Sequence, residues 1–137
     1  MKSFLILFIS LLFLEAKTIV VASSSEFPLN KLTKEQVKGI YLGKIRRIKR
    51  YKIIPVNLKA KDPLRKEFEK YVLKKSGEWL NRHWLQAHYH GHHPPKVFHS
   101  KKAAILFVKK VKKAVCYLYE EDAEKADLKI LYKEEVK

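Results

Sequence analysis

The chain has 137 residues, of which 30 are Lys or Arg and 14 are Asp or Glu, so its formal net charge is +16. This length accommodates one domain, with or without a targeting segment, and excludes a barrel enzyme or a receptor with several membrane spans. A hydrophobic fraction of 47% is sufficient for a folded core, and the excess of basic residues favours an anionic partner.

The first residues have the features of a secretory signal peptide. Lys2 provides a basic start, residues 4–14 are almost entirely apolar, and Ala16 is a small residue at the expected cleavage position. The apolar run is shorter than the roughly 20 residues that a membrane span needs. We therefore expect cleavage after residues 1–16 and export of 17–137 to the periplasm as one domain. The alternative is an uncleaved N-terminal anchor. Export argues against nucleic acid as a partner.

Strands and helices alternate along the remaining chain. Polar residues that can cap a helix precede each apolar segment of helical period. These caps are Thr33, Asp62, Ser76 and Ser100. Short runs rich in β-branched and aromatic residues indicate strands. These runs are 18–22, 52–58, 114–119 and 128–132. The alternation predicts an α/β layer with a mostly parallel sheet.

The only cysteine lies within the apolar run 114–119. Because Cys116 has no partner, it cannot form an internal disulfide. Its apolar neighbours favour a buried structural thiol over a nucleophile.

Several segments together resemble one known family. They are the helix end Ile40-Tyr41-Leu42-Gly43-Lys44, the helix start Asp62-Pro63-Leu64-Arg65 and the strand Ala114-Val115-Cys116-Tyr117. The sequence resembles the short, single-lobe relatives of phosphate ABC-transporter substrate-binding proteins. This resemblance implies a single lobe of a type II periplasmic-binding-protein-like fold, with a mostly parallel sheet flanked by helices. It also implies a non-enzymatic domain that binds phosphate or another small oxyanion.

The resemblance also suggests where the anion binds. The candidates are Ser23, Ser24 and Ser25 after the first strand, together with Arg65 near a helix start. Helix N-termini present unpaired N–H donors and a positive potential, and a guanidinium can pair bidentately with an oxyanion. However, Pro63 removes one donor and Asp62 adds a repelling charge. The alternative is that Arg65 pairs with Asp62 or Glu69.

A basic connector occupies residues 44–52, where six of nine residues are Lys or Arg. No acidic residue occurs between residues 36 and 61. The connector therefore suits contact with an anionic membrane surface or an acidic envelope protein, and the alternative is a solvated loop. The candidate contact residues are Arg46, Arg47, Lys49 and Arg50.

All six histidines lie between residues 83 and 99. The densest group could bind a transition metal if its imidazoles converged. Its members are His88, His90, His92 and His93. The group lacks the ligand spacing of a structural or catalytic zinc site. We therefore expect no resident cofactor, only adventitious Ni, Zn or Cu.

No catalytic motif is present, so the sequence predicts a non-enzyme. The first hypothesis is an exported domain that binds a small oxyanion. The alternative is an envelope interaction module that uses the lobe as a scaffold, and the second alternative is metal binding by the histidine tract. The oligomeric state is not defined by the sequence.

Overall fold

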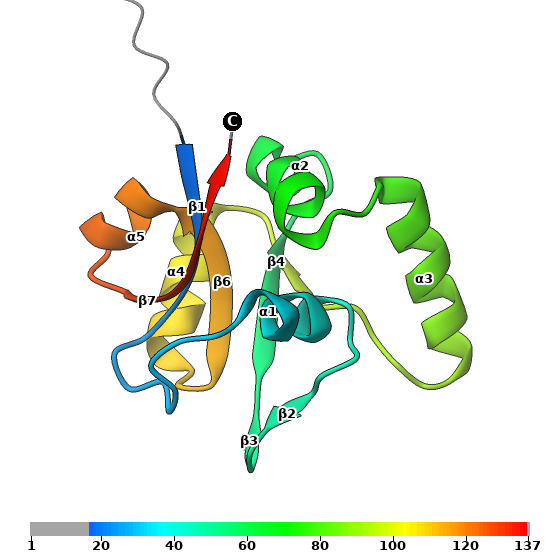
Figure 1. The fold of residues 1–137 in the computed structure, drawn as a ribbon, viewed down its shortest axis with the longest axis horizontal. Coiled ribbons are helices and arrows are strands. Elements are labelled where there is room, and N and C mark those ends of the chain that lie inside the picture. The colour runs from blue at the N-terminus through cyan, green and yellow to red at the C-terminus, as the bar shows by residue number, and fades with distance from the viewer. Residues whose placement is uncertain (1–16, 137) are drawn as a thin grey trace, which may run out of the picture.

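The computed structural model describes residues 17–136, in which strands and helices alternate as the sequence predicts (Figure 1). In chain order the elements are β1 (Lys17–Ser23), α1 (Lys34–Tyr41), β2 (Arg47–Ile48), β3 (Tyr51–Lys52), β4 (Ile54–Leu58), α2 (Pro63–Phe68), the π-helix η2 (Glu69–Leu73), α3 (Gly77–Tyr89), β5 (Lys96–Phe98), α4 (Lys101–Lys110), β6 (Ala114–Tyr119), α5 (Glu120–Lys125) and β7 (Lys129–Val136). The predicted signal peptide, 1–16, lies outside the described residues. None of the described helices is long and apolar enough to span a membrane.

The main sheet has the strand order β5-β4-β6-β1-β7. Strand β4 pairs in parallel with both β5 and β6, whereas β1 pairs antiparallel with both β6 and β7. Four strands therefore run in one direction, and β1 alone runs against them. This arrangement confirms the predicted α/β fold with a mostly parallel sheet. It also places the carboxyl end of β1 at the opposite end of the sheet from the carboxyl end of β4.

The predicted helix caps are confirmed. Thr33 forms a complete capping box with Gln36 at the start of α1, with Gln36 N to Thr33 Oγ1 at 3.1 Å and Thr33 N to Gln36 Oε1 at 2.9 Å. The Asp62 carboxylate accepts from the N–H of Leu64 at the start of α2. Ser76 and Ser100 cap α3 and α4 in the same manner. Each cap accepts a hydrogen bond from an N–H group that has no carbonyl acceptor within its own helix.

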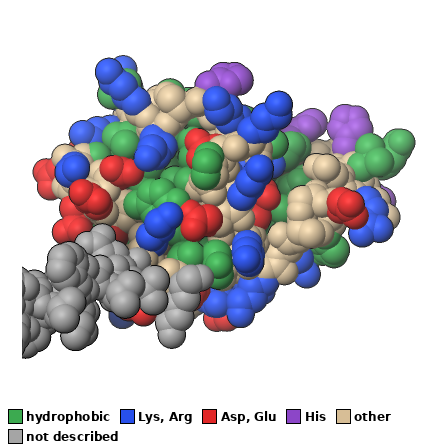
Figure 2. All heavy atoms as spheres, turned by 90° about the horizontal axis from the view of Figure 1, so that it is seen from above, with side chains coloured by type: hydrophobic (Ala, Val, Ile, Leu, Met, Phe, Trp, Pro, Cys, Tyr) green, Lys and Arg blue, Asp and Glu red, His purple; other side chains and the backbone are tan. Residues whose placement is uncertain are grey.

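Charge is distributed unevenly over the surface. In Figure 2, which shows the molecule from above, Lys and Arg side chains are spread over the whole visible face, while acidic ones gather mainly toward the side that carries α5. That helix has three acidic residues in its first turn, where the helix dipole favours them. The connector that follows α1, by contrast, contains no acidic residue.

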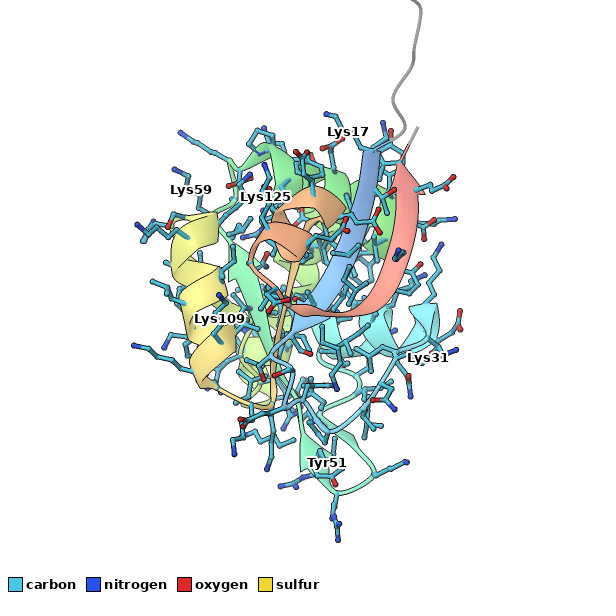
Figure 3. The ribbon with its side chains drawn as sticks, turned by 90° about the vertical axis from the view of Figure 1, so that its left-hand side faces the viewer. Lys17, Lys31, Tyr51, Lys59, Lys109 and Lys125 are labelled. Atoms are coloured by element: carbon cyan, nitrogen blue, oxygen red, sulfur yellow. The ribbon has the colours of Figure 1, made fainter. Side chains whose placement is uncertain are left out.

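Four features of the fold are not predicted from the sequence. The basic connector folds back as a hairpin, β2–β3, which projects from the lower end of the molecule with Tyr51 near its tip (Figure 3). The short strand β5 and the short helix α5 are also additional, and β7 extends to Val136 beyond the predicted strand. The hairpin strands, β5 and α5 are too short to have a clear hydrophobic period.

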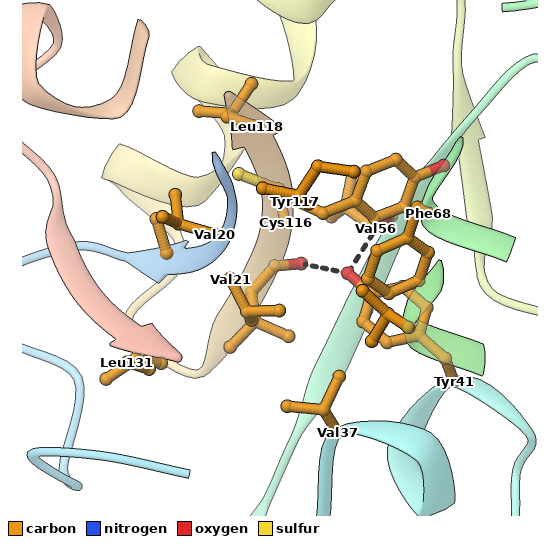
Figure 4. Packing of buried hydrophobic residues seen from close by; sticks show 14 of the residues in the cluster. Val20, Val21, Val37, Tyr41, Val56, Phe68, Cys116, Tyr117, Leu118 and Leu131 are labelled. Atoms are coloured by element: carbon orange, nitrogen blue, oxygen red, sulfur yellow. Dashed lines mark hydrogen bonds between the residues drawn. The ribbon is translucent and has the colours of Figure 1, made fainter. Parts of the chain in front are cut away.

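The core lies on both faces of the sheet. On one face, Tyr41 of α1 and Phe68 of α2 pack on Tyr117 of β6, with the Phe68 and Tyr117 rings stacked at a centroid distance of 4.0 Å. Cys116 and Leu118 alternate with Tyr117 and lie toward the opposite face, where α4 packs (Figure 4). Burial raises the pKa of the Cys116 thiol to about 12. Cys116 is therefore the buried structural thiol that its neighbours predict.

Candidate anion-binding groove

Arg65 is a half-buried residue of α2 and is held by two neighbours. Its Nε donates to the Glu69 carboxylate at 2.9 Å, and a terminal nitrogen donates to the Leu58 carbonyl at 2.8 Å. The intrahelical pair with Glu69 is therefore formed, and Asp62 caps the helix instead of pairing with Arg65. These contacts fix the orientation of the guanidinium and leave its other N–H groups for a ligand.

A groove of about 750 Å³ opens beside Arg65, between the helical turns of α2 and η2 and the start of α3. We call it the basic groove. Its lining contains five basic side chains and one carboxylate, that of Glu69. The basic residues are Arg65, Lys66, Lys70, Lys74 and Lys75. Because Glu69 already pairs with Arg65, the lining keeps an excess of positive charge.

The local backbone explains why so many lysines meet there. The π-helical turn 69–73 ends at Lys74, which has a left-handed conformation with φ of 55°. The chain then reverses, and the N–H of Lys75 donates to the Glu69 carbonyl at 3.1 Å. Ser76 and Gly77 follow at the start of α3, where the helix dipole adds positive potential to the groove.

Lys75 also contacts an aromatic ring. Its ammonium lies 4.2 Å from the centroid of the Trp79 ring, which is a cation–π distance. The contact holds the lysine at the groove wall. Binding of an anion there would therefore cost less side-chain entropy than binding at an unrestrained lysine. The groove thus combines a positioned arginine, a positioned lysine and a helix N-terminus.

The structure does not bring the serine group to Arg65. Because β1 runs against β4 and β6, Ser23–Ser25 leave the sheet at the end opposite α2. Ser23 and Ser24 are buried, and their hydroxyls serve the local turn: Ser23 donates to the Ser24 carbonyl, and Ser24 accepts from the N–H of Glu26. The two halves of the site that the resemblance suggests are therefore separated.

The four candidate contact residues of the connector lie on the β2–β3 hairpin. Arg46, Arg47, Lys49 and Arg50 are all exposed, and none forms an ion pair with another residue of the described range. The apolar residues between them, Ile45, Ile48 and Tyr51, pack partly against the core. The hairpin therefore presents its cations outward on an apolar support.

The histidines have separate environments. The Nε2–H of His83 donates to the Leu42 carbonyl at 2.7 Å, and the imidazole stacks on Trp79, so His83 joins α3 to the end of α1. The rings of His88 and His93 are 6.3 Å apart. Within residues 17–136, no group of three or more His, Cys, Asp or Glu side chains is arranged to hold a metal ion. His88, His90, His92 and His93 thus do not converge as the metal hypothesis requires.

Comparisons with known proteins identify the fold. No family model and no curated protein matches the chain. Solved structures match over 85% of the chain. An ABC-type phosphate transport receptor from Vibrio cholerae is 20% identical with a TM-score of 0.66, and PstS from Borrelia burgdorferi is 15% identical with a TM-score of 0.64. A putative phosphate ABC transporter substrate-binding protein from Clostridium perfringens, with bound phosphate, is 18% identical with a TM-score of 0.67.

These matches show the fold of phosphate ABC-transporter substrate-binding proteins, as the resemblance implies. The chain spans 46%, 47% and 44% of the length of these three structures, so its fold corresponds to somewhat less than half of such a protein. The matched proteins are described as transport receptors and substrate-binding proteins, not as enzymes. The basic groove could not be found from the sequence, because Lys70, Lys74 and Lys75 carry no motif and meet Arg65 only through the turn after η2.

Proposed function

We propose that this chain is an exported, non-enzymatic domain that binds a small oxyanion of the phosphate type in the basic groove. The observation that carries the proposal is the lining of five basic side chains with one carboxylate, which Arg65 already neutralises. The matched structures support it, since they are described as phosphate receptors. Serines at the far end of the sheet have no part in this site.

The proposed site binds an anion and does not change it chemically. A tetrahedral oxyanion presents several acceptor oxygens, which suit the guanidinium of Arg65, the ammonium groups of Lys70 and Lys75 and the first N–H groups of α3. Because the groove is open to solvent, these interactions are partly screened, and we expect weak affinity with exchange on a fast timescale. Such a domain would require a covering partner to retain its ligand.

The first prediction concerns Lys70 and Lys75. The double variant Lys70→Gln, Lys75→Gln removes two charges but keeps the Arg65–Glu69 pair, so binding of inorganic phosphate should weaken about tenfold. Titration calorimetry with phosphate and with sulfate measures this change. The matched control is Arg46→Gln, Lys52→Gln on the hairpin, which removes the same charge outside the groove and should leave phosphate affinity unchanged.

Two results would contradict the proposal. One is the absence of phosphate and sulfate binding at millimolar concentration. The other is an equal loss of affinity in both double variants, since that would indicate general attraction to a positive protein. If no anion binds and a stable protein partner is captured instead, the alternative of an envelope interaction module gains support.

A further inference from the structure

A second groove lies where the basic hairpin meets the histidine tract. Its volume is about 420 Å³, and it has no lining residue in common with the basic groove. Two sequence segments more than 30 residues apart form its walls: the hairpin, through Arg46 and Lys52, and residues 91–96. We call this site the hairpin–histidine groove. The fold thus brings together the basic hairpin and the histidine tract, neither of which lines the basic groove.

The lining of this groove is apolar with cations around it. Isoleucine, proline and tryptophan side chains supply the apolar part. They are Ile40, Ile45, Ile53, Ile54, Pro55, Trp84, Pro94 and Pro95. Arg46, Lys52 and Lys96 supply the charge, and no carboxylate is among the lining residues. A ligand that matches this surface carries negative charge next to an aliphatic portion.

His92 provides an independent observation, because one of its ring nitrogens lacks a hydrogen-bond partner. It lines the groove, and its Nδ1 is buried without a hydrogen-bond partner among the described residues. Buried polar atoms in folded proteins are almost always hydrogen-bonded, so an unpaired one requires an explanation. Because this nitrogen has almost no exposed surface, an anionic ligand in the groove would accept a hydrogen bond from it only after the imidazole turns toward the groove.

Exposed apolar side chains stand next to the histidine tract. Leu85 is 60% exposed and Tyr89 is 80% exposed, one turn apart near the end of α3 and directly before residues 90–93. Tyrosine is enriched where a protein meets the headgroup region of a membrane, and a lipid surface offers an apolar interior for such side chains. Nucleic acid offers phosphate charge but no aliphatic region that would bury Leu85.

We propose that this end of the molecule binds the surface of an anionic phospholipid membrane, with a lipid phosphate group in the hairpin–histidine groove. The cations of the hairpin tip, Arg47, Lys49 and Arg50, would face neighbouring headgroups. The aliphatic floor would contact the first methylenes of the lipid chains, and Leu85 and Tyr89 would enter the interface. This binding is independent of the basic groove and of free phosphate.

The test is co-sedimentation with phosphatidylcholine vesicles that do or do not contain phosphatidylglycerol. Protein expressed from the full sequence is used, and the difference between the two vesicle types removes any contribution of residues 1–16 that does not depend on lipid charge. We expect binding to the anionic vesicles that weakens as salt increases. Arg46→Gln, Lys52→Gln should weaken the partition onto anionic vesicles about tenfold at low salt, because each cation near an anionic surface contributes favourably.

The matched control is Lys70→Gln, Lys75→Gln in the basic groove, which should retain vesicle binding. Leu85→Ser, Tyr89→Ser should weaken vesicle binding without changing net charge. An equal loss in both charge variants would overturn the proposal, since it would indicate diffuse attraction. Retention of binding in the Leu85, Tyr89 variant would also overturn it, as would tighter binding to a duplex DNA fragment than to anionic vesicles under the same salt.

Discussion

Tyr41 connects α1 to the neighbouring strands β4 and β6 through one hydroxyl group. The hydroxyl donates to the Val56 carbonyl at 2.9 Å and lies 3.4 Å from the Val115 carbonyl (Figure 4). Burial raises the pKa of Tyr41 well above its usual value, so the hydroxyl stays protonated and remains a donor. The ring packs on Phe68 and Tyr117, which places the side chain at the centre of the core.

We predict that Tyr41→Phe lowers the free energy of unfolding by about 1–3 kcal/mol, because the ring is kept but the buried Val56 carbonyl loses its donor. Urea unfolding followed by circular dichroism measures the change. Tyr89→Phe is the control, because Tyr89 is 80% exposed and should have little effect. Equal stability of the Tyr41 variant and the wild type would show that the hydroxyl contributes nothing.

At the scale of single residues, contacts between near neighbours in the sequence can be predicted. A site that is built from distant segments cannot. The caps at Thr33, Asp62 and Ser76 follow from the sequence because a cap interacts with residues two or three positions away. The site of Arg65 depends on the direction of β1, which no local pattern specifies. The serines therefore satisfy their own turn at one end of the sheet, while lysines that show no motif join Arg65 at the other.

Helix α3 is attached to the body through few contacts. Leu80 is its only buried residue, and His83 and Trp84 reach back to the end of α1. Gly43 lies in that place with φ of 75°, and a Cβ there would stand 2.8 Å from Cη2 of Trp84. Gly91, at the other end of α3, has φ of 76° but open space around it.

Gly43 and Gly91 can be compared directly, because they share a backbone conformation but differ in the space around them. Both Gly43→Ala and Gly91→Ala place alanine in the left-handed region, which costs about 1–2 kcal/mol. Only Gly43→Ala also displaces Trp84, so it should destabilise the protein more and loosen α3. Urea unfolding gives the difference in stability, and hydrogen exchange of the α3 amides reports the loosening. Equal effects of the two substitutions would contradict the role of the Gly43–Trp84 contact.

Elements of clear period were predictable, and short elements were not. Strand β5 has three residues and gains its strand character from pairing with β4 through Val56, Asn57 and Leu58. Helix α5 has six residues and buries only Ala123, although its three leading acidic residues are a usable signal for a helix start. The hairpin forms where sequence shows only a basic run, because Ile45, Ile48 and Tyr51 pack on the core.

The whole molecule carries a formal net charge of +16, because its Lys and Arg side chains outnumber its Asp and Glu side chains by that number. Its ion pairs leave this excess unchanged, since each of them joins one cation to one anion. Among residues 17–136, most of these pairs are surface contacts, which contribute little to stability. Repulsion among the remaining cations opposes the compact state. The positive charge that lines both grooves is therefore part of an excess that lowers stability.

We predict that stability rises with ionic strength. Sodium chloride screens the repulsion, so the urea midpoint should increase from low-millimolar salt to physiological salt. Phosphate at the same ionic strength should raise the midpoint further if it binds the folded state. A midpoint that falls with sodium chloride would show that attractive pairs outweigh the repulsion.

The pairing of β1 with β7 brings the two ends of the described chain together, since Lys17 is the register partner of Val136. The polypeptide enters and leaves the fold side by side, at the end of the sheet from which the hairpin does not project (Figure 1). Neighbouring termini at a surface favour insertion of a domain into another polypeptide and circular permutation. The described fold could therefore be inserted into a larger polypeptide through two connections that lie side by side. Both grooves would remain intact in such a fusion.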